Sequence, residues 1–297
     1  MFGTLGNSFK LLGISWGILK SDRELLLFPL MAAGALFFVF AYTAAAFWAG
    51  GTFDRIGPDY RFYLADFIFL ALAYFLASFV IVYFSAALSA AAYQRIEGFS
   101  PDLQTGLMAA NDRLGAIAGW SAIAASVAMA LNQMSDSRSL LGRVFGAALR
   151  LLWGYSTFFV VPVLVIESSS PLDALSRSTE LFRQQWGKAM VANFGFGLAY
   201  GVVAMLALGP AALLYFGLGS TFLAVTAGVA LLTLGVATVK ALETIFVVTL
   251  YDYAATGRIG GGFSDSMVRD AYVSKQDRGR FRPSMPERPS GRYGRAA

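Results

Sequence analysis

Long apolar segments alternate with short polar connections along most of this chain. Six of the segments are long enough to cross a bilayer, because about 20 helical residues span a hydrocarbon core about 30 Å thick. They cover residues 25–48, 64–92, 114–134, 144–166, 189–216 and 222–250. The apolar runs are continuous and lack the residue-by-residue alternation of β-barrel strands. The pattern predicts an all-α polytopic membrane protein with six transmembrane helices.

Three shorter stretches with both polar and apolar residues each begin near a serine: Ser8, Ser100 and Ser170. In two of them a proline follows the serine, and Ser-Pro suits an N-cap and the first helical position. In the third stretch one helical face collects apolar side chains, while Arg177, Ser178 and Arg183 lie on the remainder. That apolar face comprises Leu172, Leu175, Thr179, Phe182 and Trp186.

We interpret these stretches, at about 7–21, 100–113 and 170–187, as amphipathic elbow helices on the cytoplasmic membrane surface. Each precedes an odd-numbered span, so the spans group into three repeats of an elbow helix plus a transmembrane hairpin. The alternative is that any amphipathic connector of a membrane protein shows this pattern. In the third elbow helix, Arg177, Ser178, Arg183 and Trp186 are the predicted contact residues.

The distribution of basic residues predicts the orientation. Cytoplasmic loops carry an excess of Lys and Arg. Most of the 23 Lys and Arg residues fall in residues 1–24, in the connections 93–113 and 167–188, and in the C-terminal tail. Six spans place all of these on one side. We therefore expect a multi-pass protein of the bacterial plasma (inner) membrane with cytoplasmic N- and C-termini.

Composition restricts the chemistry. Hydrophobic residues make up 57% of the chain and charged residues 14%, against about 45–50% and about 25% in soluble domains. Cys and His are both absent, which excludes disulfides, thiol nucleophiles and most zinc sites. The sequence contains no Walker-type loop and no nucleophile elbow. We predict that the protein is not an enzyme and has no catalytic, cofactor-binding or metal-binding residue.

Ionisable residues inside predicted spans are the best functional candidates, because burying a charge in lipid is costly. Lys240 and Glu243 lie three residues apart in the sixth span, on one helical face. They form either a site for a coupling ion or a lipid headgroup, or a self-neutralised pair with Lys240 extended toward the membrane surface. The second, structural interpretation is favoured.

Two further candidates flank the fourth span. Arg150 could bind a lipid phosphate, pair with Asp66 or Glu243, or extend to the outer interface, which is the favoured alternative. Glu167 closes the span close to Arg177 and Arg183. We expect Glu167 to anchor the third elbow helix against the bundle.

The last segment of the chain differs from the rest in composition. Residues 256–297 lose the apolar periodicity and combine arginines with prolines, which is typical of a disordered basic tail. Such a tail attracts anionic membrane lipids. No folded nucleic-acid reader accompanies it, so no specific nucleic-acid partner is expected.

The chain resembles uncharacterised bacterial six-span integral membrane proteins, which are loosely similar to the membrane domain that accompanies some glycerophosphodiester phosphodiesterases. The resemblance covers residues 1–255 and rests on two degenerate motifs. These are Ser15-Trp16 with Phe28-Pro29-Leu30, and the series Pro162, Glu167, Pro171, Ala174-Leu175, Ser178 and Trp186-Gly187. The resemblance implies a membrane domain without an established activity.

Together these features predict a lipid-organising or complex-forming membrane component. Its expected partners are membrane lipids, another membrane protein or a second copy of the chain. The alternative is a transporter or channel that uses Lys240 and Glu243 inside the membrane.

Overall fold

The computed structural model describes residues 16–17, 19–20, 22–52, 63–135, 140–186, 196–218 and 220–257. Within these residues every regular element is a helix. Six helical segments are long and apolar enough to cross a membrane: Arg23–Ala49, Leu64–Ile96, Leu114–Asn132, Gly142–Ile166, Ala199–Phe216 and Thr226–Thr256. The predicted all-α class with six spans is confirmed. The threefold repeat stays a prediction, since the first elbow stretch lies mostly outside the described residues.

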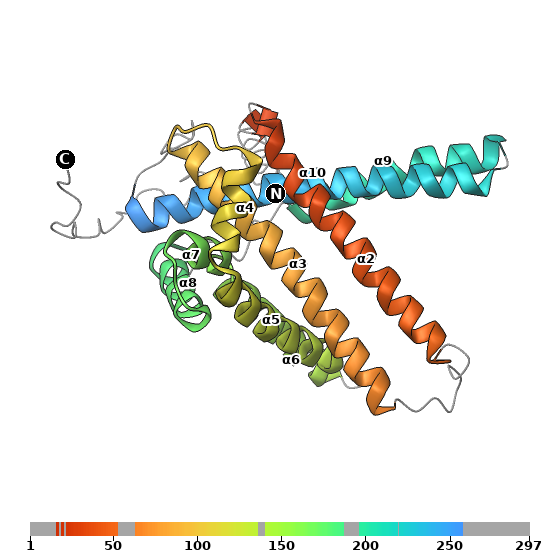
Figure 1. Ribbon diagram of the computed structural model, residues 1–297, viewed down its shortest axis with the longest axis horizontal. Helices are drawn as coiled ribbons and strands as arrows, with labels where there is room; N and C mark the ends of the chain where they lie inside the picture. Colours follow the sequence, from red (N-terminus) through yellow and green to blue (C-terminus); the bar gives the residue numbers. More distant parts are fainter. Residues whose placement is uncertain are drawn as a thin grey trace.

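The long helices form three hairpins (Figure 1). The first hairpin joins α2 (Leu27–Ala49), which follows the short η1 (Arg23–Leu26), to α3 (Leu64–Ile96). The second joins α5 (Leu114–Ser135) to α6 (Leu140–Ser156). The third joins α9 (Phe196–Leu218) to α10 (Thr221–Thr256). The shorter helices α4 (Leu103–Asn111), α7 (Val160–Ile166) and α8 (Pro171–Trp186) connect them.

The predicted fourth span is two helices in the structure. Helix α6 ends at Ser156, a turn follows, and α7 begins at Val160. Pro162 lies in the first turn of α7, where its missing N–H removes no helical hydrogen bond. Continuous hydrophobicity could not reveal this break, because both helices and the turn between them are apolar.

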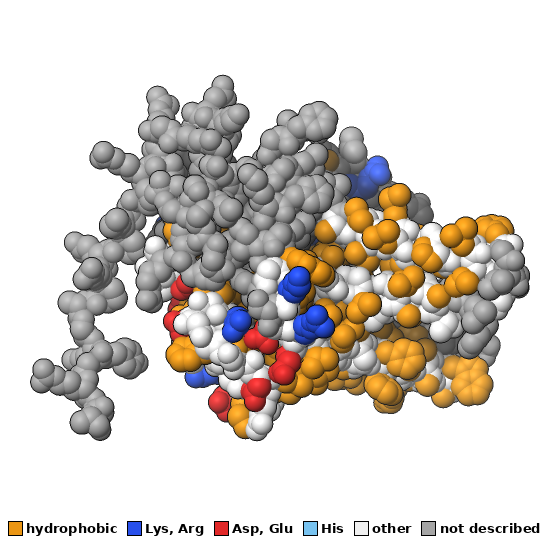
Figure 2. Space-filling view, turned by 90° about the horizontal axis from the view of Figure 1, so that it is seen from above, with side chains coloured by type: hydrophobic (Ala, Val, Ile, Leu, Met, Phe, Trp, Pro, Cys, Tyr) orange, Lys and Arg blue, Asp and Glu red, His pale blue; other side chains and the backbone are white. Residues whose placement is uncertain are grey.

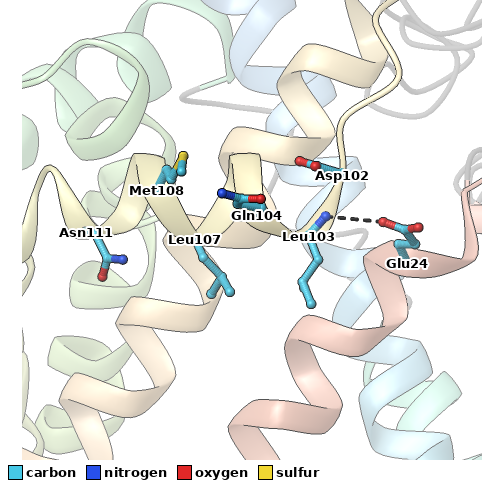
Figure 3. A pocket seen from close by; sticks show the side chains of 7 residues that line it. All are labelled: Glu24, Asp102, Leu103, Gln104, Leu107, Met108 and Asn111. Atoms are coloured by element: carbon cyan, nitrogen blue, oxygen red, sulfur yellow. Dashed lines mark hydrogen bonds between the residues drawn. The ribbon is translucent and has the colours of Figure 1, made fainter.

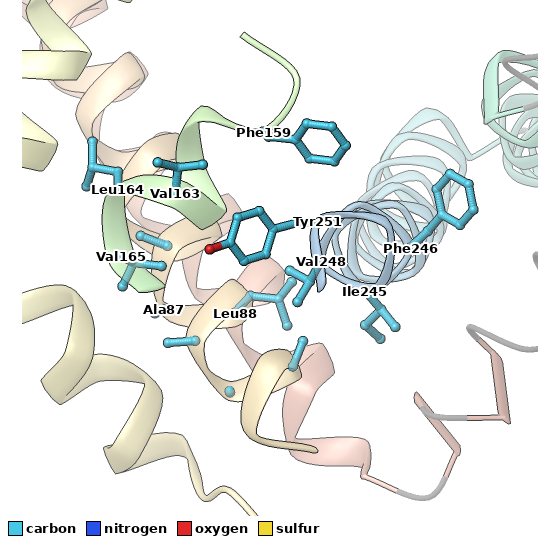
Figure 4. Packing of buried hydrophobic residues seen from close by; sticks show 14 of the residues in the cluster. Ala87, Leu88, Phe159, Val163, Leu164, Val165, Ile245, Phe246, Val248 and Tyr251 are labelled. Atoms are coloured by element: carbon cyan, nitrogen blue, oxygen red, sulfur yellow. The ribbon is translucent and has the colours of Figure 1, made fainter. Parts of the chain in front are cut away.

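Buried side chains concentrate at one end of the molecule, which we call the hub. It consists of α4, α7, α8, the end of α3 from residue 82 and the end of α10 from residue 241. Figure 4 shows α7 and α10 packed over α3, with Tyr251 projecting from α10 toward α7. Phe159, Val163 and Leu164 are completely buried there, at 0% exposed. The hub is therefore the protein-lined core of an otherwise open arrangement.

Close helix approach in the hub depends on a glycine. A Cβ atom on Gly106 of α4 would lie 2.5 Å from Phe28 Cζ and 2.7 Å from the carbonyl oxygen of Ala87. Real Cβ atoms do not come so close to such neighbours, so α4 rests directly on α2 and α3 only because residue 106 has no side chain.

The third hairpin extends away from the other helices (Figure 1). We call α9 together with residues 221–240 of α10 the arm. The described part of α9 packs along α10 and has no other extensive contact with the described helices. Small residues bring the two helices together, with Gly235 against Val203 and Gly228 against Ala211. Large apolar side chains of α9 such as Met205, Leu213 and Phe216 are 76%, 75% and 83% exposed.

The surface follows the same division. On the face in Figure 2, charged side chains gather mainly near the hub, and the part toward the hairpin ends is mostly apolar. A surface that is apolar over such an area suits lipid as its surroundings.

The two elbow helices that the structure describes differ in detail from their predicted forms. For α4 the N-cap is Asp102, whose carboxylate accepts a hydrogen bond from the Thr105 N–H, and not Ser100. In α8, Ser170 does cap the helix by accepting from the Asp173 N–H at 3.3 Å. The buried face of α8 is Ala174, Ser178 and Leu181.

The apolar face predicted for α8 is therefore not its buried face. Leu172 is 66% exposed, and Thr179 is exposed as well. Small side chains are selected at the hub because they allow the closest packing, so the face that hydrophobicity favours turns partly outward.

Candidate functional site

Lys240 and Glu243 of α10 form an ion pair that a tyrosine of α9 extends. The Lys240 ammonium lies 2.9 Å from Glu243 Oε2. The Tyr200 hydroxyl donates to the same oxygen at 2.8 Å. The pair satisfies its own charges, as the structural interpretation expects. Sequence reasoning missed Tyr200, because nothing in the chain indicates which residue of α9 faces Glu243.

Lys240 marks the boundary between arm and hub on α10. Its side chain is 53% exposed and that of Glu243 is 27% exposed. From residue 241 to 255 no residue of α10 is exposed, whereas exposed positions recur between 226 and 240. Lys240 is thus the last open position before α10 enters the hub.

Glu167 joins three elements at the other end of the hub half of α10. It follows α7 directly, accepts a hydrogen bond from the Tyr251 hydroxyl of α10 at 2.9 Å, and lies 3.4 Å from Arg177 Nε of α8. Arg177 also contacts Glu180 at 3.4 Å. The structure thus places Glu167 where it can hold α8 to the bundle. Tyr251, 3% exposed, was not identified from the sequence.

Ser178 links α8 to the break between α6 and α7. Its hydroxyl oxygen accepts a hydrogen bond from the Phe159 backbone N–H at 2.9 Å. Both residues are 0% exposed. The N–H groups at the beginning of a helix lack partners within that helix, so Ser178 stabilises the backbone where α7 starts.

The other two predicted contact residues of α8 contribute less. Arg183 is exposed. Trp186 is the last residue of α8, and its side chain lies outside the described part of the chain.

Arg150 contacts neither of its two predicted acidic partners. Its guanidinium donates to the carbonyl oxygen of Leu131 at 3.4 Å and to Asn132 Oδ1 at 3.3 Å. These groups belong to the last turns of α5, where carbonyl oxygens lack helical partners and a cation is favoured. Asn132 in turn donates to the Tyr74 hydroxyl of α3 at 3.3 Å. The prediction that Arg150 pairs with Asp66 or Glu243 is therefore wrong, because α5 lies nearer.

Asp66 has local partners at the far end of the first hairpin. Its carboxylate accepts from the Thr52 hydroxyl at 2.7 Å and from the Tyr63 N–H at 3.1 Å. Asp66 and Thr52 are each 3% exposed. A buried carboxylate needs such donors, and here they hold the ends of α2 and α3 together.

A shallow depression of about 530 Å³ lies between α4 and the start of α2 (Figure 3). Its lining residues are Glu24, Asp102, Leu103, Gln104, Leu107, Met108 and Asn111. The Glu24 carboxylate already accepts from the Leu103 N–H at 3.2 Å. Hydrogen bonds from the Thr105 side chain and N–H lower the pKa of Asp102. These carboxylates therefore act as helix caps.

No cluster of three or more metal-ligating side chains occurs in the residues that the structure describes. Six apolar helices, a one-sided hub and paired intramembrane charges define a multi-pass α-helical membrane protein. The chain belongs to a family of unknown function, DUF6159, whose model matches residues 64–262. That match contains α3 to α10 and every candidate residue from Arg150 to Glu243, but not α2.

No curated protein and no solved structure matches the chain. The resemblance to the membrane domain that accompanies some glycerophosphodiester phosphodiesterases gains no support from these comparisons and stays an expectation.

Proposed function

We propose that the protein is a non-enzymatic, lipid-organising component of the bacterial plasma membrane. The observation that carries this proposal is the uncovered arm. Helix α9 packs along α10 alone to any extent, and its other faces present large apolar side chains. Lipid tails are as apolar as leucine, so such faces are stable when lipid covers them.

The divergence of the arm supports this role. In Figure 1 the arm and the α2–α3 hairpin leave the hub in different directions. Two apolar walls that separate from a common base leave a wedge between them inside the bilayer. Lipid molecules that enter this wedge touch protein on two sides, and that contact orders them.

The hub side is proposed to face the cytoplasm. Arg95, Arg113 and Arg177 all lie in the connections on this side, as the excess of basic residues in cytoplasmic loops requires. The basic tail after residue 256 leaves from the same end. Each basic residue near an anionic surface contributes about 1 kcal/mol of attraction.

A complex-forming role would cover the arm with protein in place of lipid. The chain has no cysteine, so single cysteines can carry nitroxide spin labels. We choose Leu206→Cys, at a residue that is 68% exposed, and the matched control Ala207→Cys, at a neighbour that is 1% exposed. Electron paramagnetic resonance then measures the access of oxygen, which concentrates in lipid.

The lipid-organising proposal predicts high oxygen access at position 206 and low access at position 207, both in reconstituted vesicles and in native membranes. Low access at 206 in native membranes, combined with high access in vesicles of pure lipid, would replace the proposal with a complex-forming role. Low access at 206 in both would mean that copies of the chain cover the arm.

A further inference from the structure

We propose that Lys240, Glu243 and Tyr200 bind the headgroup of an ethanolamine phospholipid. In this site the lipid phosphate contacts the Lys240 ammonium, and the lipid ammonium contacts the Glu243 carboxylate. The inference deepens the proposed lipid-organising function and rests on it, because the site needs lipid beside the arm.

The depth of the pair matches the headgroup level. The helical rise places Lys240 about 29 Å from the beginning of α10, which is close to the hydrocarbon thickness of about 30 Å. Tyr200 lies only one turn into the described part of α9, which starts at Phe196. Both helices of the arm therefore reach the hub-side membrane surface at this pair, and not at the middle of the bilayer.

The pair retains hydrogen-bonding capacity. An ammonium has three donors, and Glu243 takes one of those of Lys240. Glu243 Oε2 accepts from both Lys240 and Tyr200, and Oε1 has no hydrogen-bond partner among the described residues. A donor group and an acceptor group thus lie side by side, with the lysine side chain half exposed.

Charge decides which headgroup fits. The pair is neutral as a whole, so an anionic headgroup meets the attraction of Lys240 and the repulsion of Glu243 together. A zwitterionic headgroup places its negative phosphate on Lys240 and its positive amine on Glu243. Ethanolamine also donates N–H hydrogen bonds to the carboxylate, whereas choline has no N–H group. Charge-assisted hydrogen bonds are the stronger kind, so ethanolamine is favoured over choline.

The test measures lipid retained by the full-length protein. Purified protein is exposed to vesicles with equal parts phosphatidylethanolamine, phosphatidylglycerol and phosphatidylcholine, and the bound lipids are counted by native mass spectrometry. The variants are Lys240→Gln and Glu243→Gln, with Arg143→Gln as the control. Arg143 is an exposed cation on α6, outside the site. Thermal unfolding of each variant verifies that it folds.

Wild type and the Arg143→Gln variant should retain phosphatidylethanolamine in preference to the other two lipids. Lys240→Gln should lower that preference about tenfold, the change that 1.4 kcal/mol produces. Glu243→Gln should transfer the preference to phosphatidylglycerol, because it leaves the Lys240 charge without its partner. This switch does not occur if the pair serves packing alone.

Two results would overturn the inference. Equal retention of the three lipids by wild type, or unchanged retention in both site variants, would remove the headgroup site and leave the lipid-organising proposal intact. Retention of no lipid at all, together with low oxygen access at position 206, would remove the proposed function as well.

Discussion

The two halves of α10 belong to one uninterrupted helix, yet they have different surroundings. Both halves are strongly apolar, but residues 241–255 are covered by α3, α7 and α8, whereas Val229, Leu231 and Leu234 of the arm are 58%, 41% and 48% exposed. Apolar side chains avoid water in either case. The comparison teaches that hydrophobicity reports what a side chain avoids, and not whether protein or lipid covers it.

The largest effect should come from truncating matched side chains in the two halves. Ile245 is 0% exposed and Leu234 is 48% exposed. Ile245→Ala should leave a cavity in the hub and lower the free energy of unfolding by about 2–5 kcal/mol. Leu234→Ala should change it by less than about 0.5 kcal/mol, since lipid or detergent fills the space. Unfolding in mixed detergent micelles measures both, and equal losses would contradict the division into hub and arm.

A second test asks whether α4 is pressed as tightly against the hub as Gly106 indicates. Gly106→Ala should cost about 1–3 kcal/mol, because the added methyl group meets Phe28 and the backbone of Ala87. Gly115→Ala is the control, because a Cβ atom there would meet nothing within 4 Å. In the control the higher helix propensity of alanine should stabilise α5 slightly. Two stable variants would show that α4 moves freely.

A smaller effect is expected at the start of α7. Ser178→Ala removes the hydrogen bond to the buried Phe159 N–H and should lower the free energy of unfolding by about 1 kcal/mol. Thr179→Ala serves as the control, since that exposed hydroxyl bonds only the Leu175 carbonyl of its own helix at 2.9 Å. A loss of the same size in both variants would mean that α8 does not support the break between α6 and α7.

Most of the fold could be predicted from the sequence, because spans announce themselves by length and hydrophobicity. One available signal was not used. Helices α3 and α10 have 33 and 36 residues, more than the roughly 20 that a bilayer needs. The excess indicates that both continue beyond the membrane, and their extended ends build the hub.

The site could be predicted only in part. Lys240, Glu243 and Glu167 stand out because ionisable residues are rare in apolar segments. Tyr200 and Tyr251 do not stand out, since tyrosine is common at membrane surfaces and its partners depend on how distant helices align. The partner of Arg150 was missed for the same reason: the register between α5 and α6 decides it, and a single sequence does not contain that register.

The continuity of α10 also has a mechanical consequence. Its 36 residues form a single rod about 54 Å long, with one half clamped in the hub. A change in bilayer thickness tilts spanning helices, and a tilt of the arm must turn the clamped half with it. The break between Ser156 and Val160 has the opposite effect, because it lets α6 lean without moving α7. Strain in the membrane therefore reaches the hub along α10 and is absorbed before it arrives from α6.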